Sequence, residues 1–296
     1  MNGVSASPSI CLVMPYFGKW PFWMPFFLQS CRFNPTVNWV FYSDCEELED
    51  CPENVRLVRM SFSEYCALVS QKLGADFRPD RAYKLCDIRP AFGLIHQDDL
   101  QGYDFWGFGD IDLIYGDIRA YFTDERLSRY DLYSTHARRV SGHLCLIRNN
   151  ARMREAFKQI PKWKERFCDP KHQALDEGAF TRLFLRNKNL PDVMQKIIGT
   201  LFNPFYRRSE FVEAFSTPCA RISWHDGSRA FPEKWYWRTG KLTNNRDGVR
   251  EFPYFHFIVW KQEAWKKVPQ AELDASATLA KSHAWSVSPQ GFECEK

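Results

Sequence analysis

Two aspartates separated by one residue, Asp110 and Asp112, carry the most chemical information in this sequence. They lie in FWGFGDIDLIYGDI, residues 105–118, directly after an apolar run that predicts a buried strand. Side chains two residues apart in a strand point to the same side, so two carboxylates at a strand end would converge. Such a pair suits Mg²⁺ or Mn²⁺ held together with a diphosphate, and Gly107 and Gly109 would let a ligand approach closely. The alternative is a pair of solvated loop aspartates.

Alternating strands and helices are expected on both sides of this pair. Apolar or alternating runs predict strands over 10–16, 37–42, 55–60, 103–108, 131–135 and 143–147. Helical spacing predicts helices over 21–31, 63–73, 83–95, 150–160 and 177–185. This alternation favours an α/β layered domain, whose ligands bind at the carboxyl ends of the strands.

Composition limits the classes of protein to which this chain can belong. It has 296 residues, 45% of them hydrophobic, and 40 Lys and Arg against 36 Asp and Glu, a net charge of +4. This describes a folded protein without the basic stripe of a nucleic-acid binder. Local basic clusters such as Arg207 with Arg208 indicate either a solvated helix face or a binding patch. Lys19, Pro21 and Pro25 interrupt the most apolar stretch, so no transmembrane helix is predicted.

The cysteines and the N-terminus indicate the cellular compartment. Ten cysteines occur without a CxxC pair or zinc-finger spacing, and the first residues lack the pattern of a signal peptide. We therefore predict a cytoplasmic protein with reduced thiols.

Several motifs in chain order resemble glycosyltransferases of the GT-A fold that use nucleotide-sugar donors. They are VMPYFGKW at 13–20, YSD at 42–44, YKLCDIRPAFG at 83–93 and YDFWGFGDIDLIYGDI at 103–118. The last two together are similar to a bacterial family of surface-polysaccharide glycosyltransferases, which act in capsule and O-antigen synthesis. The resemblance covers roughly residues 10–190, with a further match near 256. It implies a GT-A-like Rossmann-type mixed sheet flanked by helices, with a C-terminal extension.

The resemblance also implies roles for the residues on the donor side. Asp110 and Asp112 would hold Mn²⁺ or Mg²⁺ on the donor diphosphate. Asp87 would accept hydrogen bonds from sugar hydroxyls, and Lys84 and Arg89 would lie near the diphosphate or the sugar. The alternative for these three helix residues is a set of surface salt bridges.

Further donor contacts are expected at the ends of the first two strands. Asp44 would meet the base or the ribose. Tyr16 or Trp20 would stack on the base, although each suits a protein core equally well.

A late histidine often completes the metal site in related enzymes. His256, in EFPYFHFIVWK, is the favoured candidate, and Lys261 after it would reach the phosphates. His225, in SWHDG, is a weaker candidate, and a hydrogen-bonded core histidine is the alternative for His256.

Asp176 and Glu177, in HQALDEGAF, precede a helix and are the candidate catalytic carboxylates. One of them would be the general base in an inverting enzyme, or would lie near the donor anomeric carbon in a retaining one. Their alternative role is capping of the helix N-terminus.

The function that the resemblance implies is a metal-dependent hexosyltransferase. It would move a sugar from a nucleotide diphosphate sugar, with a UDP-sugar as the expected donor, to a saccharide or lipid-linked saccharide acceptor in surface-polysaccharide synthesis. One alternative is a metal-dependent phosphohydrolase or nucleotidyltransferase, which would show further carboxylates for a second metal. Another is a non-catalytic carbohydrate-binding protein.

The domain boundaries and a possible membrane contact are also read from the sequence. We expect one domain over 1–269, with a donor half at 10–120 and an acceptor half at 121–269, and a weakly ordered tail at 270–296. An aromatic cluster would form a buried helix or, with a lipid-linked acceptor, a peripheral contact with the inner membrane. Its members are Phe17, Trp20, Phe22, Trp23, Phe26 and Phe27.

Overall fold

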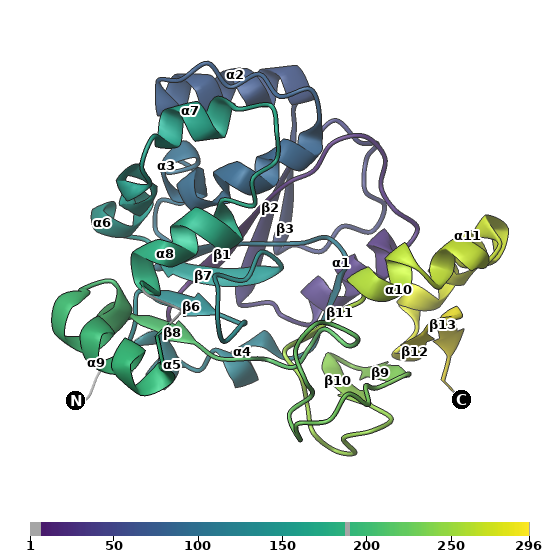
Figure 1. The fold of residues 1–296 in the computed structure, drawn as a ribbon. Coiled ribbons are helices and arrows are strands. Elements are labelled where there is room, and N and C mark those ends of the chain that lie inside the picture. Colours follow the sequence, from purple (N-terminus) through teal and green to yellow (C-terminus); the bar gives the residue numbers. More distant parts are fainter. Residues whose placement is uncertain (1–6, 187–189, 296) are drawn as a thin grey trace, which may run out of the picture.

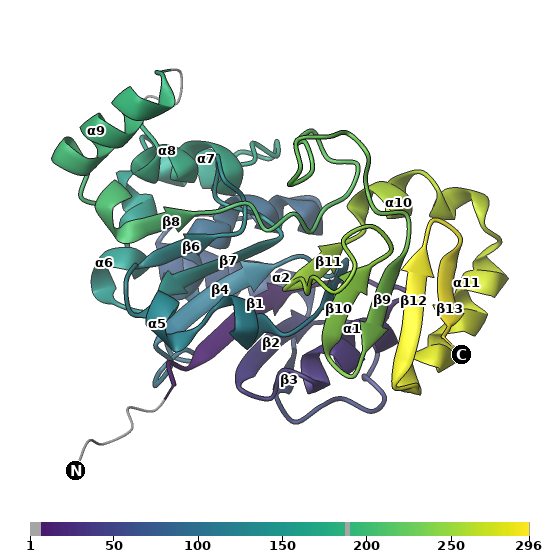
Figure 2. The same ribbon diagram turned by 90° about the horizontal axis from the view of Figure 1, so that it is seen from below.

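A seven-stranded mixed sheet lies at the centre of the computed structural model, which describes residues 7–186 and 190–295 (Figures 1 and 2). The strands are hydrogen-bonded in the order β3-β2-β1-β4-β7-β6-β8, and β7 runs antiparallel to both of its neighbours. Their bounds are β1 (Ile10–Pro15), β2 (Val37–Ser43), β3 (Val55–Arg59), β4 (Phe105–Gly109), β6 (Leu132–Ser134), β7 (Leu144–Arg148) and β8 (Ser209–Phe211).

The central strands are apolar throughout because both faces of the sheet are covered. In β1, Cys11 and Val13 belong to the core on one face, and Ile10, Leu12 and Met14 to the core on the other. Parallel strands that are buried on both faces require such unbroken apolar runs. The α/β fold class predicted from the sequence, a mixed sheet flanked by helices, is confirmed.

Helices cover both faces. One face carries α2 (Phe62–Leu73), η1 (Ala82–Ala91), α3 (Phe92–Ile95), α6 (Ala151–Arg154), η2 (Ala156–Gln159), α7 (Trp163–Cys168), η3 (Asp176–Phe180) and α8 (Thr181–Phe184). The other face carries α1 (Met24–Arg32), α4 (Ile118–Tyr121) and α5 (Asp124–Leu127). After α8 the chain forms α9 (Asp192–Phe202) and η4 (Tyr206–Arg208).

The two glycines before the aspartate pair lie close to the backbone of the neighbouring segment, and Gly109 also lines a cavity. A Cβ atom on Gly107 would lie 2.4 Å from the backbone oxygen of Cys145. One on Gly109 would lie 3.1 Å from the backbone oxygen of His143. Gly107 therefore allows β7 to approach β4 closely, which corrects the expectation that its role is to admit a ligand.

A second sheet is built by the C-terminal part of the chain. Its order is β10-β9-β12-β13, with β9 (Trp235–Arg238), β10 (Lys241–Asn244), β12 (Ala284–Ser288) and β13 (Gly291–Cys294). Helices α11 (Gln270–Ser276) and η6 (Ala277–Lys281) precede β12.

Residues 270–295 therefore form regular elements in place of the expected weakly ordered tail. Leu273, Trp285 and Phe292 are buried in the core beside this sheet. The sequence pattern does not reveal this packing, because β12 pairs with β9, which lies far away along the chain.

The aromatic cluster of the first helix packs against this C-terminal region. The Phe26 ring stacks on Phe292 at 3.7 Å between centroids, and Phe22 meets Trp265 at 5.4 Å. All six aromatic residues of the cluster are buried or half-buried: Phe26 and Phe27 lie in α1, and the other four precede it. No helix within residues 7–186 and 190–295 combines the length and apolar character needed to cross a bilayer.

A short two-stranded sheet links the two regions. It pairs β5 (Leu113–Tyr115) antiparallel with β11 (Tyr254–His256), which is followed by α10 (Ile258–Gln262) and η5 (Trp265–Lys267). In this register His256 lies opposite Leu113. A residue near the end of the chain is thereby placed beside the aspartate pair.

Candidate functional site

A cavity of about 700 Å³ opens at the carboxyl edge of the central sheet. The strands β1, β4, β6 and β8 end at this edge, and β7 begins there. The residues just beyond these ends line the cavity: Tyr16, Asp110, His136, Glu213 and His143. The strand order thus gathers polar side chains from distant segments at one place, where α/β sheets bind ligands.

Asp110, Asp112 and His256 form the centre of this site. Each offers a ligand atom, and these atoms lie within 4.8 Å of one another. The Nε2 atom of His256 is 3.9 Å from Oδ2 of Asp110 and 3.6 Å from Oδ1 of Asp112. The two aspartates lie on the bend between β4 and β5, so this bend brings their carboxylates together.

The hydrogen bonding of His256 fits a metal ligand. Its Nδ1 atom is 3.2 Å from Oγ1 of Thr217, whereas its Nε2 atom is buried and has no hydrogen-bond partner. A buried ring nitrogen without a partner is costly unless something else binds it. Because Nε2 is directed at two carboxylates, a hard divalent cation such as Mn²⁺ or Mg²⁺ fits between the three groups, with Thr217 orienting the ring.

Lys261, on α10, adds a positive charge to the site. Its Nζ atom lies 2.5 Å from Oδ2 of Asp112 and 5.7 Å from the ring centre of Trp23. Burial by itself raises the pKa of Asp112, but His256 and Lys261 outweigh it and hold this pKa well below its ordinary value. Asp112 is therefore ionised, as a metal ligand must be.

Arg89 lies between the pair Asp110 and Asp112 and two other carboxylates of the cavity, Asp176 and Glu177. Its Nη2 atom donates to Oδ1 of Asp110, and its Nη1 atom donates to the backbone oxygen of Gly142 at 2.8 Å. The same Nη1 lies 3.4 Å from Oδ2 of Asp176. One buried guanidinium thus fixes the distance between Asp110 and Asp176.

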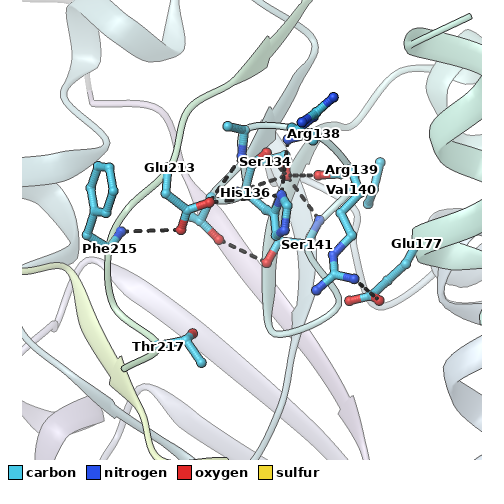
Figure 3. Close-up of polar contacts among 12 residues, drawn as sticks. Ser134, His136, Arg138, Arg139, Val140, Ser141, Glu177, Glu213, Phe215 and Thr217 are labelled. Carbon is cyan, nitrogen blue, oxygen red and sulfur yellow. Dashed lines mark hydrogen bonds and ion pairs between the residues drawn. The ribbon is translucent and has the colours of Figure 1, made fainter. Parts of the chain in front are cut away.

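Asp176 and Glu177 begin the π-helix η3 at the cavity wall. The backbone N–H of Glu177 donates to Oδ1 of Asp176 at 2.9 Å, and Oε2 of Glu177 pairs with Nη1 of Arg139 at 3.1 Å (Figure 3). Burial raises the pKa of Asp176 to about 7, with Arg89 opposing the rise and Glu177 adding to it. Such a pKa suits a group that exchanges a proton near neutral pH.

The raised pKa of Asp176 predicts a pH-dependent stability. Its pKa is 3.8 when unfolded and about 7 when folded, so between these values the folded state binds more protons. The free energy of unfolding should therefore fall as pH rises from 4 to 7, by on the order of 4 kcal/mol from this group. Asp176→Asn should remove this contribution, which urea unfolding at pH 5 and pH 8 measures. We expect the free energy of unfolding of the variant, relative to that of the wild type, to rise by about 2 to 3 kcal/mol between pH 5 and pH 8. A difference between the two proteins that is the same at both pH values would contradict the assignment.

Lys84 and Asp87 are fully engaged with the protein and do not line the cavity. Asp87 accepts hydrogen bonds from Lys84 at 2.8 Å and from the backbone N–H groups of Gln173 and Leu175 at 2.9 Å each. Lys84 also donates to the backbone oxygens at 166 and 171. This buried pair holds the loop that leads to Asp176, so any contribution to the site acts through that loop.

The other predicted donor residues lie at the end of β1 and near it. Tyr16 lines the cavity, and Trp20 stacks behind its ring at 5.2 Å. Asp44 is exposed and accepts a hydrogen bond from the backbone N–H of Gly18 at 2.8 Å. His225, the weaker candidate for a metal ligand, pairs with Asp247 at 2.6 Å. It does not belong to the group formed by Asp110, Asp112 and His256.

His136 and Glu213 also line the cavity and have no counterpart among the sequence predictions (Figure 3). His136 accepts a hydrogen bond at Nδ1 from the backbone N–H of Arg138 at 3.0 Å. Burial and the neighbouring arginines lower the pKa of His136 to about 4, so the ring is neutral. Glu213 accepts from the backbone N–H groups of Ala137 and Phe215 at 3.3 and 3.4 Å. Glu213 follows β8, a strand that the sequence pattern does not predict, so no sequence signal marks it.

Comparison with known proteins identifies a family and some fold-level likenesses. A model for a family of unknown function, DUF6625, matches residues 12–293. No curated protein matches the sequence. A crystal structure of the galactosyltransferase LgtC with donor and acceptor sugar analogues is 13% identical, with 57% of this chain and 71% of that chain covered at a TM-score of 0.34. The apo form of mouse xyloside xylosyltransferase 1 is 10% identical, with 85% and 98% covered at a TM-score of 0.37.

Proposed function

This chain belongs to the family of unknown function DUF6625, and we propose from its site that it transfers a sugar from a nucleotide diphosphate sugar, with a divalent cation, to a saccharide acceptor. The observation that carries the proposal is the buried, unpartnered Nε2 atom of His256, directed at Asp110 and Asp112 beside a large cavity. A Mn²⁺ or Mg²⁺ ion held there would neutralise negative charge on a departing diphosphate.

The residues around the metal group suit a diphosphate and its base. Lys261 supplies an ammonium group next to Asp112, where it can pair with phosphate oxygens once a ligand enters. Tyr16 has one ring face supported by Trp20, which leaves a rigid aromatic platform at the cavity for the base. A uridine diphosphate sugar is the donor that we propose.

The carboxylates beyond Arg89 suit the sugar side of the reaction. We propose that Asp176 lies nearest to the reacting sugar, because Arg89 pairs with both Asp110 and Asp176 and so holds Asp176 close to the proposed metal. Its pKa of about 7 lets it take a proton from an acceptor hydroxyl near neutral pH. Glu177 pairs with Arg139, which also lines the cavity. A role in surface-polysaccharide synthesis rests on the resemblance of the motifs.

The residues around Asp110, Asp112 and His256 favour this proposal over a two-metal phosphohydrolase. Within residues 7–186 and 190–295, one group of three potential ligands is found. The carboxylates that are nearest to the pair in sequence have structural roles: Asp104 accepts hydrogen bonds from Ser9, and Asp117 caps α4. Asp176 and Glu177, two other acidic residues of the site, pair with Arg89 and Arg139, so the described part of the chain shows no second group of three ligands.

Calorimetric titration with a panel of nucleotide diphosphate sugars, with and without Mn²⁺, tests the proposal. We expect at least one donor to bind only when Mn²⁺ is present. Absence of metal-dependent binding for every donor would refute the function. Binding of free saccharides without nucleotide or metal would favour the carbohydrate-binding protein, and release of inorganic phosphate from nucleotides would favour the phosphohydrolase.

A further inference from the structure

Helix α9 presents large apolar side chains to the solvent. Eight such side chains are exposed among the described residues, and five of them, between 48% and 75% exposed, belong to this helix: Val193, Met194, Ile197, Leu201 and Phe202. Val193, Ile197 and Leu201 recur at every fourth position, so they form a row along one face. An apolar row on a soluble helix normally faces the core, and here it faces outward.

The orientation of α9 is fixed by contacts on its other face. A Cβ atom on Gly199 would lie 2.7 Å from the ring of Tyr206, so this glycine seats the helix closely on η4. At the end of the helix, the Asn203 side chain donates to the backbone oxygens of Leu183 and Phe184 at 3.0 and 2.9 Å. These contacts hold the apolar row away from the body, and α9 projects from the edge of the molecule in both views (Figures 1 and 2).

Positive charge is concentrated in the same segment. Residues 182–186 and 190–208 carry five basic residues and one acidic residue, a net charge of +4 that equals that of the whole chain. Arg186, Lys196 and Arg207 are exposed there, and Arg208 is exposed beside its partner Asp131. A helix with an exposed apolar row, in a segment that carries several exposed cations, is complementary to a surface that offers both anionic groups and hydrocarbon.

We propose that α9 docks this protein on a membrane that contains anionic lipids, with its apolar row inserted at the interface and Arg186, Lys196 and Arg207 on lipid phosphates. A helix lying in the plane of the interface buries its apolar face among the acyl chains while basic side chains meet the headgroups. The docking needs neither metal nor nucleotide, so it holds or fails independently of the proposed sugar transfer.

Vesicle flotation with the full chain tests the proposal. Vesicles of phosphatidylcholine with phosphatidylglycerol should carry the protein, and vesicles of phosphatidylcholine alone should not. Binding should weaken as salt is added, because exposed charges are screened. Lys196→Glu with Arg207→Glu should lower the partition coefficient by at least about 25-fold, since each basic residue contributes about fivefold, or about 1 kcal/mol. Ile197→Ser with Leu201→Ser should reduce it more than tenfold, from the loss of buried apolar groups.

Matched controls lie on other parts of the surface. Val249→Ser alters a side chain that is 95% exposed, and Lys266→Glu reverses an exposed charge on η5. Both variants should float like the wild type. Failure of the wild type to bind anionic vesicles, or equal loss in the control variants, would overturn the proposal. So would a dimer in light scattering that Ile197→Ser with Leu201→Ser converts to a monomer, because a second copy would then cover the row.

Discussion

Asp112→Asn should abolish Mn²⁺-dependent binding of the nucleotide diphosphate sugar while the protein remains folded. Asp112 is buried and lies within reach of both His256 and Lys261, so its carboxylate is the charged centre of the metal group. The amide keeps the shape of the side chain but loses the negative charge that a divalent cation requires. Loss of a residue that only supports a metal ligand already costs 10- to 100-fold in affinity, so we expect a loss of at least about 100-fold here.

Calorimetric titration with Mn²⁺ and with donor measures this loss, and circular dichroism checks the fold. Asp76→Asn is the matched control, because Asp76 is an exposed carboxylate paired with Arg78. It should bind as the wild type does. Undiminished affinity of the Asp112 variant would remove this residue from the metal group and leave the proposed function without its centre.

Arg89→Met should produce the largest loss of stability among single substitutions in the site. The Arg89 side chain is 12% exposed and lies between Asp110 and Asp176. The only other basic side chain that pairs with either carboxylate in the described part of the chain is His256, 3.9 Å from Asp110. Removal of Arg89 leaves two carboxylates without their charge partner. Removing one member of a buried ion pair typically costs 3–5 kcal/mol, so the free energy of unfolding at pH 8 should fall by about that amount. Urea unfolding measures it.

The cause of this loss can be separated from a general effect of removing an arginine. Arg78→Met is the control, since its ion pair with Asp76 is exposed and should contribute less than about 1 kcal/mol. In Arg89→Met combined with Asp176→Asn, one unpaired carboxylate is absent, so part of the stability should return. If Arg89→Met costs no more than Arg78→Met, the guanidinium does not hold the two carboxylates together.

Much of the core of this fold is predictable from local patterns. The unbroken apolar runs at β1, β2 and β4 indicate strands buried on both faces, and Ser61 with Gly74 bounds α2. The Asp110 and Asp112 pair is visible for the same reason: it follows a strand directly. These features depend on residues that are close together along the chain.

The buried position of Asp87 shows where local patterns fail. Its place on a helix before the aspartate pair gives no indication that the backbone at 173 and 175 surrounds its carboxylate. The same holds for Leu273, Trp285 and Phe292, whose spacing resembles a weakly ordered tail until β9 pairs with β12. Burial and pairing depend on partners that are distant in sequence, and the patterns of single segments do not contain them.

The sequence by itself determined the α/β class, the edge of the sheet at which the cavity opens, and a short group of candidates that included both aspartates and His256. Only the tertiary structure decided how these candidates are related. The pairing of β5 with β11 places His256 beside Asp112, Arg89 links Asp110 to Asp176, and α9 turns its apolar row outward. The physical reason is that residue type and spacing govern local conformation, whereas the distance between side chains 87 or 149 residues apart is set by the packing of the whole chain.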